Sequence, residues 1–143
     1  MNELSLNRTI GAVSLQERQC VKEVTEFLKA LPQADLPVEQ FVYNGIYTRT
    51  CFLRKGIIMA SVLIKIPTVL TVCGDAWFST GKTKRHFKGY EVLACEAGRC
   101  GVWCAHEDTY ITMSFKTECK TAEEAEKEFT DDWQNLTTRR FEV

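Results

Sequence analysis

The sequence has little of three things that mark particular classes of protein: net charge, long apolar runs and histidine. Its 143 residues carry 18 Lys and Arg against 19 Asp and Glu, for a formal net charge of -1. This balance excludes the overall electrostatic bias toward nucleic acid or anionic membranes that a strongly basic chain would have. A preference for an anionic ligand must therefore come from a local set of residues.

The chain also lacks a segment suited to a membrane or to secretion. Spanning a bilayer takes roughly 18 or more apolar residues, and Lys65 interrupts the longest apolar stretch, residues 57–72. The first five residues show no basic region followed by an apolar core, so no signal peptide is predicted. We therefore expect a cytoplasmic protein with no membrane partner.

Cysteine is plentiful by contrast, with seven residues spread along the chain. The number is odd and nothing marks the chain as secreted, so reduced thiols are expected rather than a disulfide framework. Histidine is limited to His86 and His106.

The order of local patterns predicts one domain over residues 1–143. With 45% hydrophobic residues, a chain of this length can bury a core without metal or disulfide support. A capping box at 14–17 begins a helical arm over 14–31, and a second at 121–124 begins a C-terminal helix over 121–138. Residues 41–119 between them are rich in β-branched and aromatic residues, with glycine-containing turns at intervals typical of a sandwich or barrel.

This order predicts a mainly β protein, a β-roll or barrel flanked by an N-terminal and a C-terminal α-helix. An apolar stripe on either helix could pair with a second copy of the chain. We therefore expect a homo-oligomer.

Residues 76–83 resemble a relaxed phosphate-binding loop, with four residues between a small residue and Gly81-Lys82-Thr83. Such a loop needs glycines that bring backbone N–H groups onto phosphates, and a helix that begins directly after it. Ala76 occupies the first glycine position and bulky Trp77 follows it. A basic hairpin turn is the favoured interpretation.

Three cysteines and a histidine, Cys95, Cys100, Cys104 and His106, are close enough in sequence to suggest zinc or a reactive thiol. Cysteines used as small apolar residues are the favoured explanation. A thiol hydrolase that pairs one of these cysteines with a histidine stays open as an alternative.

The β segment carries more Lys and Arg than Asp and Glu, whereas the C-terminal helix is acidic. This division could direct a small anionic molecule, for instance a nucleotide, to the β segment, or it could be an ordinary solvated surface. Aromatic residues among the cations could stack on bases or fill the core. The candidate ligand-binding residues from these two sets are Arg49, Lys65, Lys82, Arg85, Tyr47 and Trp77.

Several short segments, in order, resemble the small cupin-like proteins of tailed phages. The resemblance spans roughly residues 43–129 and its most specific part is Ala105-His106-Glu107-Asp108-Thr109. The remaining segments are residues 44–49, 54–56, 73–75 and 96–99. The resemblance implies a β-roll of cupin type with a ligand pocket in the barrel mouth, and it adds His106 to the candidate ligand-binding residues.

Cupin metal sites generally take histidines and a carboxylate from an early pair of strands and a last histidine from a later strand, because a divalent metal needs three or four N or O ligands. Only His106 matches this pattern. The run 64–69, where the early ligands should lie, has no histidine or acid, and Lys65 would repel a cation. We therefore expect no metal and no cofactor.

The resulting hypothesis is a non-enzymatic phage protein in the host cytoplasm that sequesters a small anionic ligand, such as a nucleotide signal of host defence. Two alternatives stay open. One is a metal- or thiol-dependent cupin-like enzyme, and the other is a protein–protein inhibitor that engages a host factor through its acidic C-terminal helix.

Overall fold

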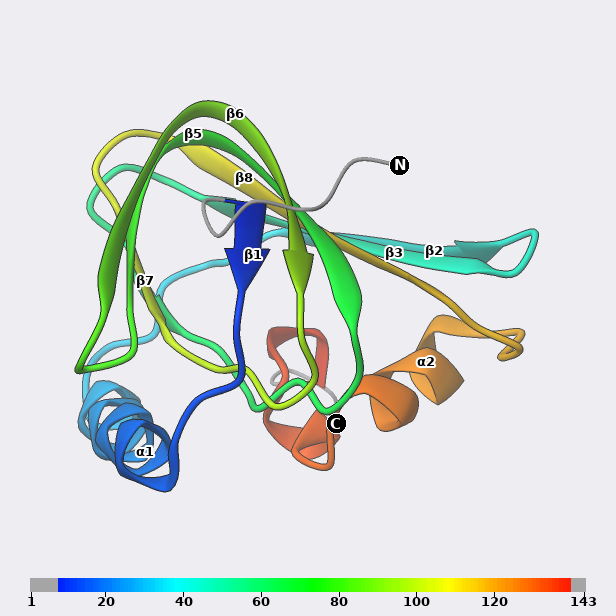
Figure 1. The fold of residues 1–143 in the computed structure, drawn as a ribbon, viewed down its shortest axis with the longest axis horizontal. Coiled ribbons are helices and arrows are strands. Elements are labelled where there is room, and N and C mark those ends of the chain that lie inside the picture. The colour runs from blue at the N-terminus through cyan, green and yellow to red at the C-terminus, as the bar shows by residue number, and fades with distance from the viewer. Residues whose placement is uncertain (1–7, 140–143) are drawn as a thin grey trace.

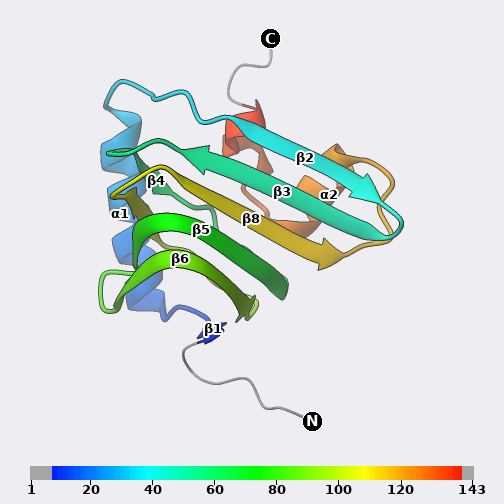
Figure 2. The same ribbon diagram turned by 90° about the horizontal axis from the view of Figure 1, so that it is seen from above.

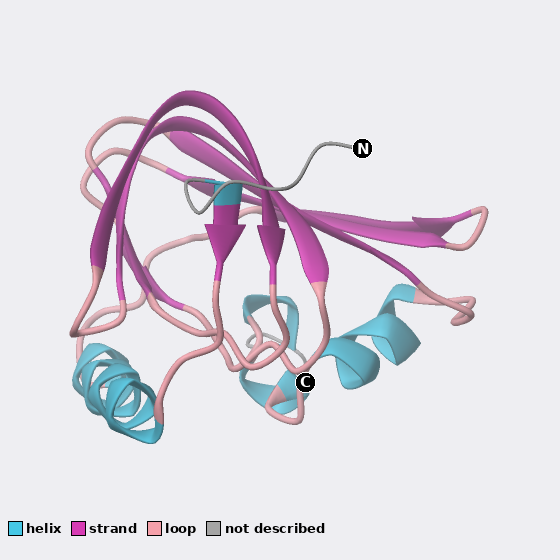
Figure 3. Cartoon of the chain, viewed as in Figure 1, coloured by secondary structure: helices cyan, strands magenta, loops and turns pink. Residues whose placement is uncertain are grey.

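A computed structural model describes residues 8–139, which form one curved sheet with helices on its concave side (Figures 1 and 3). The strands, in chain order, are β1 (Thr9–Ile10), β2 (Val38–Tyr43), β3 (Ile46–Leu53), β4 (Ile58–Ala60), β5 (Thr68–Ser79), β6 (Lys84–Cys95), β7 (Val102–Ala105) and β8 (Thr109–Lys116). The helices are α1 (Leu15–Lys29) and α2 (Ala122–Phe129), followed by 3₁₀ turns at Trp133–Asn135 and Thr137–Arg139.

The sheet follows the order β1-β6-β5-β8-β3-β2, which is clear when the molecule is seen from above (Figure 2). All of these pairs are antiparallel except β1 with β6. The first half of β5 pairs with β8, whereas its second half pairs with β7, which in turn pairs with β4. β5 therefore passes from one layer of the roll into the other.

β5 and β6 arch together over the molecule (Figure 1). Midway along them Gly74 and Gly89 are register partners, with φ of 146° and 89°. Side chains rarely tolerate such positive φ values, so glycine permits the bend here. A Cβ on Gly74 would lie 2.6 Å from the Asp108 carbonyl oxygen, so that position also needs glycine for space.

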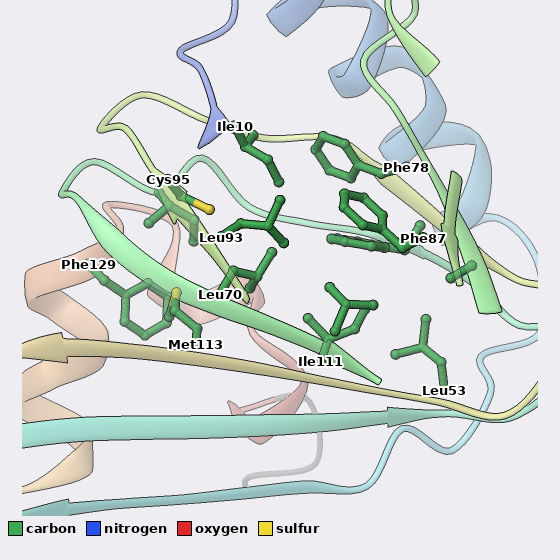
Figure 4. Close-up of a cluster of buried hydrophobic side chains, with 14 of the residues drawn as sticks. Ile10, Leu53, Leu70, Phe78, Phe87, Leu93, Cys95, Ile111, Met113 and Phe129 are labelled. Carbon is green, nitrogen blue, oxygen red and sulfur yellow. The ribbon is translucent and has the colours of Figure 1, made fainter. Parts of the chain in front are cut away.

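The core lies on the concave face of the sheet (Figure 4). Alternate residues of β8 are buried, as expected for a strand with one face toward the interior and one toward solvent. Large side chains from β5, β6 and β8 meet there; they include Leu70, Phe87, Leu93, Ile111 and Met113. Each such burial stabilises the fold by about 1.5–3 kcal/mol.

α1 begins at the predicted capping box, in which Ser14 and Glu17 exchange side-chain to backbone hydrogen bonds. The helix lies beneath the open side of the arch (Figure 1). Val21 is its buried residue, while Leu15 and Phe27 are largely exposed. α1 is therefore attached to the roll through few side chains, chiefly Val21 and Glu17, which accepts a hydrogen bond from Thr80 Oγ1.

α2 is shorter than the helix over 121–138 that the second capping box predicts. It ends at Phe129 because Thr130 adopts an extended conformation, with φ of -151° and ψ of 147°. Phe129 packs against the rings of Tyr47 and Phe115, with centroids 5.8 and 6.2 Å away. This contact fixes the C-terminal segment beneath β3.

Two further elements differ from the sequence-based expectation. β1 lies before α1 and pairs with β6, although nothing in the sequence suggests a strand there. β2 begins at Val38, three residues earlier than the predicted start of the β region. In the part of the chain from 8 to 139, no helix is long and apolar enough to cross a bilayer.

Candidate ligand-binding cavity

A cavity of about 900 Å³ lies between α1 and the concave face of the sheet. Its inner wall is apolar and comes from β5, β7 and β8, chiefly Leu70, Trp103, Ile111 and Met113. α1 closes one side with residues that include Val21 and Leu28. Its volume falls in the range of pockets that enclose small organic ligands.

The β register produces this wall. Leu70 on β5 is the cross-strand partner of Met113 on β8, and Ile111 lies two residues from Met113 on the same face. Because side chains alternate across a strand, the same pattern that builds the core also lines the cavity.

One charged side chain, Arg99, reaches this apolar wall from the connector between β6 and β7. It is 3% exposed. A pair of backbone hydrogen bonds with Ile64 holds the connector in place, with Ile64 N donating to Arg99 O at 2.8 Å. The Arg99 Nη2 group donates to Thr68 Oγ1 at 3.1 Å and lies 3.4 Å from Met113 Sδ.

The rest of the Arg99 guanidinium is not satisfied by the protein. Nε is buried without a hydrogen-bond partner, and within residues 8–139 no hydrogen bond leaves Nη1. No Asp or Glu of this described range forms an ion pair with it. Burial lowers the pKa of Arg99, yet a guanidinium stays protonated in proteins, so the cavity wall holds a buried, uncompensated positive charge.

Arg49, a predicted ligand-binding residue, also lines the cavity but is neutralised. Its Nη1 forms a buried ion pair with Glu126 at 3.3 Å and donates to Gln40 Oε1 at 3.2 Å. Glu126 accepts further hydrogen bonds from Gln40 and Thr138. Burial lowers the pKa of Arg49, but its neighbours outweigh that effect and raise it overall. Arg49 thus has its counterion within the protein.

Tyr47, another predicted residue, lies beside Arg49 on the same face of β3 and is fully buried. Its hydroxyl donates to Gln40 Oε1 at 2.7 Å. Burial raises the pKa of this hydroxyl to about 12. The structure therefore brings Tyr47 and Arg49 together in one network, in which Tyr47 supports Gln40.

The other predicted residues lie apart from this cavity. Trp77 is on the outer face of β5, stacked on His86 with centroids 4.5 Å apart. Lys82 lies in the exposed β5–β6 turn, and Arg85 on β6 donates to Thr9 O at 2.8 Å. Lys65 is exposed and pairs with Asp131 at 2.7 Å.

His106, the most specific residue of the family resemblance, lies in the exposed loop after β7. Its backbone N–H donates to Asp75 O at 2.9 Å. It does not line the cavity.

No protein-family model and no curated protein matches the chain. Among solved structures, a cupin superfamily protein from Desulfitobacterium hafniense matches with a TM-score of 0.51 at 9% identity, covering 62% of this chain and 83% of that one. Ectoine synthase from P. lautus matches with a TM-score of 0.51 at 10% identity, covering 69% of this chain and 76% of that one. The chain has the cupin fold. At these identities the similarity concerns the fold alone.

An uncharacterized Klebsiella pneumoniae protein with a double-stranded beta-helix domain matches similarly, with a TM-score of 0.50, 10% identity and coverage of 64% of this chain and 86% of that one. The cupin-type β-roll predicted from the sequence is thus confirmed. The phage origin is addressed by none of these proteins.

The cavity of this cupin fold does not suit a divalent metal. Among its buried lining residues, Arg99 carries a positive charge that no acidic side chain within residues 8–139 pairs with, and positive charge repels a cation. Among residues 8–139, no group of three or more His, Cys, Asp or Glu side chains gathers in a way that could hold a metal ion.

Two of the three thiols named as candidate nucleophiles are not activated in this protein. Burial raises the pKa of both Cys95 and Cys100, which favours the unreactive thiol form. Cys104 is exposed on the outer side of β7, opposite Trp77. His86 is instead held by Asp75, with Nε2 and Oδ1 2.6 Å apart.

Sequence reasoning missed Arg99 as a site residue. It is one of nine Lys and Arg residues near the predicted turns, and only burial distinguishes it from the others. Its hydrogen-bond partners lie 31 and 14 residues away along the chain. The weak signal in the sequence is its place in Ala97-Gly98-Arg99-Cys100, between apolar strands.

Proposed function

We propose that the protein binds a small organic anion in the cavity between α1 and the cupin sheet, without chemical conversion. The observation that carries this proposal is the buried Arg99 guanidinium, which faces the cavity without a counterion among the described residues. Leaving a buried charge unpaired costs several kcal/mol, and a bound anion would remove that cost.

The lining supports binding rather than covalent catalysis. The two thiols that reach the cavity, Cys51 and Cys100, both have pKa values raised by burial, so neither is a ready nucleophile. The remaining inner wall is mainly hydrocarbon, which suits retention of a ligand.

A finer version of this proposal is that the protein comes from a phage and sequesters a nucleotide signal of host defence. The cavity volume supports a ligand of mononucleotide size, and Trp103 in the wall offers an aromatic surface. The phosphate would then lie at Arg99.

Isothermal titration calorimetry of the purified protein with a panel of organic carboxylates, phosphate esters and nucleotides tests the proposal. We expect at least one anion to bind at micromolar concentration, and Arg99→Gln to weaken it at least tenfold. Lys82→Gln, which removes an exposed positive charge from the β5–β6 turn, is the matched control and should leave binding unchanged. Equal binding by the wild type and Arg99→Gln would contradict the proposal.

A further inference from the structure

The cavity offers a ligand a single buried positive charge. Of its two buried arginines, Arg49 is paired with Glu126, whereas Arg99 lacks a counterion within residues 8–139. Arg18, Lys22 and Lys29 of α1 also border the cavity, as do the acidic Glu26 and Asp132, but these side chains are exposed, so solvent and salt screen them. A ligand with one negative charge is therefore matched, whereas a dianion would keep one charge unbalanced in an apolar site.

The number of free donors is also small. A guanidinium has five N–H groups, and Nη2 of Arg99 is already directed at Thr68 and Met113. The N–H groups of Nη1 and Nε remain. These are three N–H groups, and because Nη1 and Nε point to different sides of the guanidinium, a single anion cannot accept from all three. A carboxylate has two oxygens to satisfy, whereas a phosphate ester has three terminal oxygens and would leave at least one without an Arg99 donor against the apolar wall. Buried acceptors without donors are unfavourable.

On the side of the sheet, the wall beyond Arg99 is hydrocarbon and aromatic, whereas polar residues such as Thr25, Gln33 and Asn135 line other parts of the cavity. Leu70, Trp103 and Ile111 line it, and α1 adds Leu28 from the opposite side. A hydroxylated or highly polar ligand body would lose its water here without gaining partners. An aliphatic or aromatic body would instead gain from each methylene removed from water.

Building on the proposed function, we propose that the ligand is an amphipathic monocarboxylate, with its carboxylate on Arg99 and its apolar body along the inner face of β5, β7 and β8. This assigns the ligand class as an alternative to the nucleotide considered above, which brings a phosphate and a polar sugar.

Calorimetry with four probes tests this assignment: octanoate, octanol, octyl phosphate and adenosine monophosphate. We expect octanoate to bind most tightly and octanol at least tenfold less tightly. Across hexanoate, octanoate and decanoate, affinity should rise about threefold to fourfold for each added methylene. Arg99→Met should lose the preference for octanoate over octanol.

A direct signal identifies the carboxylate contact. The pKa of ¹³C-carboxyl octanoate, followed by NMR, should fall on binding to the wild-type protein because a guanidinium favours the ionised form. Thr68→Val keeps the charge of Arg99 and frees Nη2, so this variant should retain octanoate binding. It is the second variant to measure if Arg99→Met does not fold. Lys82→Gln is again the control for non-specific attraction.

The outcomes separate the two proposals. Tighter binding of octyl phosphate or the nucleotide, still lost in Arg99→Met, would overturn the monocarboxylate assignment and leave the anion cavity in place. Binding of octanol as tight as octanoate would also overturn it. Failure of every anion to bind would overturn both.

Discussion

Arg49 and Arg99 are both buried beside the same cavity, yet their surroundings give them opposite roles in stability. Arg49 completes a network with Glu126 and Gln40, whereas Arg99 has no acidic partner among the described residues. Removing one member of a buried ion pair leaves the other charge desolvated and unpaired. Removing an isolated buried charge instead removes its desolvation penalty from the folded state.

Replacement of each arginine by methionine should therefore have opposite effects on the ligand-free protein. We expect Arg49→Met to lower the free energy of unfolding by about 3 kcal/mol, because Glu126 stays buried without its guanidinium. Arg99→Met should leave the free energy of unfolding unchanged or raise it. Urea unfolding followed by circular dichroism measures both, and a larger loss in Arg99→Met would contradict the contrast.

Tyr47 should make stability depend on pH at the alkaline end. Its folded pKa, about 12, lies above the value of 10.0 for a free phenol. A raised folded pKa contributes stability that is complete below pH 10 and is lost as the pH rises toward 12, by about 2–3 kcal/mol in total.

Urea midpoints of the wild type and Tyr47→Phe at about pH 9 and about pH 11.5 measure this contribution. Tyr47→Phe should start lower, because Gln40 loses a donor, but should fall less between the two pH values. Parallel falls in the two proteins would show that Tyr47 is not the titrating group.

At the scale of elements, the arch of β5 and β6 depends on its pair of glycines. Gly74→Ala should lower the free energy of unfolding by about 3 kcal/mol or more, since the new Cβ would overlap the Asp108 and Thr109 backbone. Gly89→Ala is the matched control: its φ is also positive, but a Cβ added there would meet no atom within 4 Å, so about 1 kcal/mol of backbone strain is expected. If urea unfolding shows equal losses of unfolding free energy in the two variants, backbone strain alone accounts for both, and the overlap at Gly74 does not contribute.

Local sequence patterns predicted where the helices begin, but they did not predict features that depend on contacts distant in the chain. The capping boxes located the starts of both helices, because a cap is decided by neighbours three residues apart. The end of α2 was missed, since the extended Thr130 is buried by contacts distant in sequence. β1 was missed because two residues are too short for any periodic signal.

At the scale of the whole molecule, the β-roll was predictable from turn spacing, but the site was not. Arg49 and Tyr47 were named as cations and aromatics of the β segment, and strand alternation placed both on the inner face. Arg99 resembles every other surface arginine in sequence, and its burial arises only when the β6–β7 connector folds beneath β5 and β8.

The homo-oligomer expected from the sequence stays a prediction, and the outer face of the sheet is the surface we assign to it. Its centre carries hydroxyl side chains from β3, β5 and β8: Thr48, Thr50, Thr71, Thr112 and Ser114. Exposed Phe41 and Tyr110 lie beside them. Uncharged centres are typical of interfaces, and a two-fold axis would bring this face onto its own copy.

Sedimentation velocity should show a dimer for the wild type and a monomer for Thr112→Lys, which puts a charge at the centre of this face. Gln134→Lys adds the same charge at an exposed position near the C-terminal end and should remain dimeric. A monomeric wild type, or a dimer that tolerates Thr112→Lys, would remove the outer face from consideration.

The weak attachment of α1 has a kinetic consequence. Since Val21 is the buried residue of this helix and most of its other side chains are exposed, we expect a ligand to enter and leave by displacement of α1 while the strands stay paired. The residence time of the ligand would then depend on α1, whereas the melting temperature of the protein would depend on the strands. Changes on the inner side of α1 should speed or slow release without altering the temperature at which the roll melts.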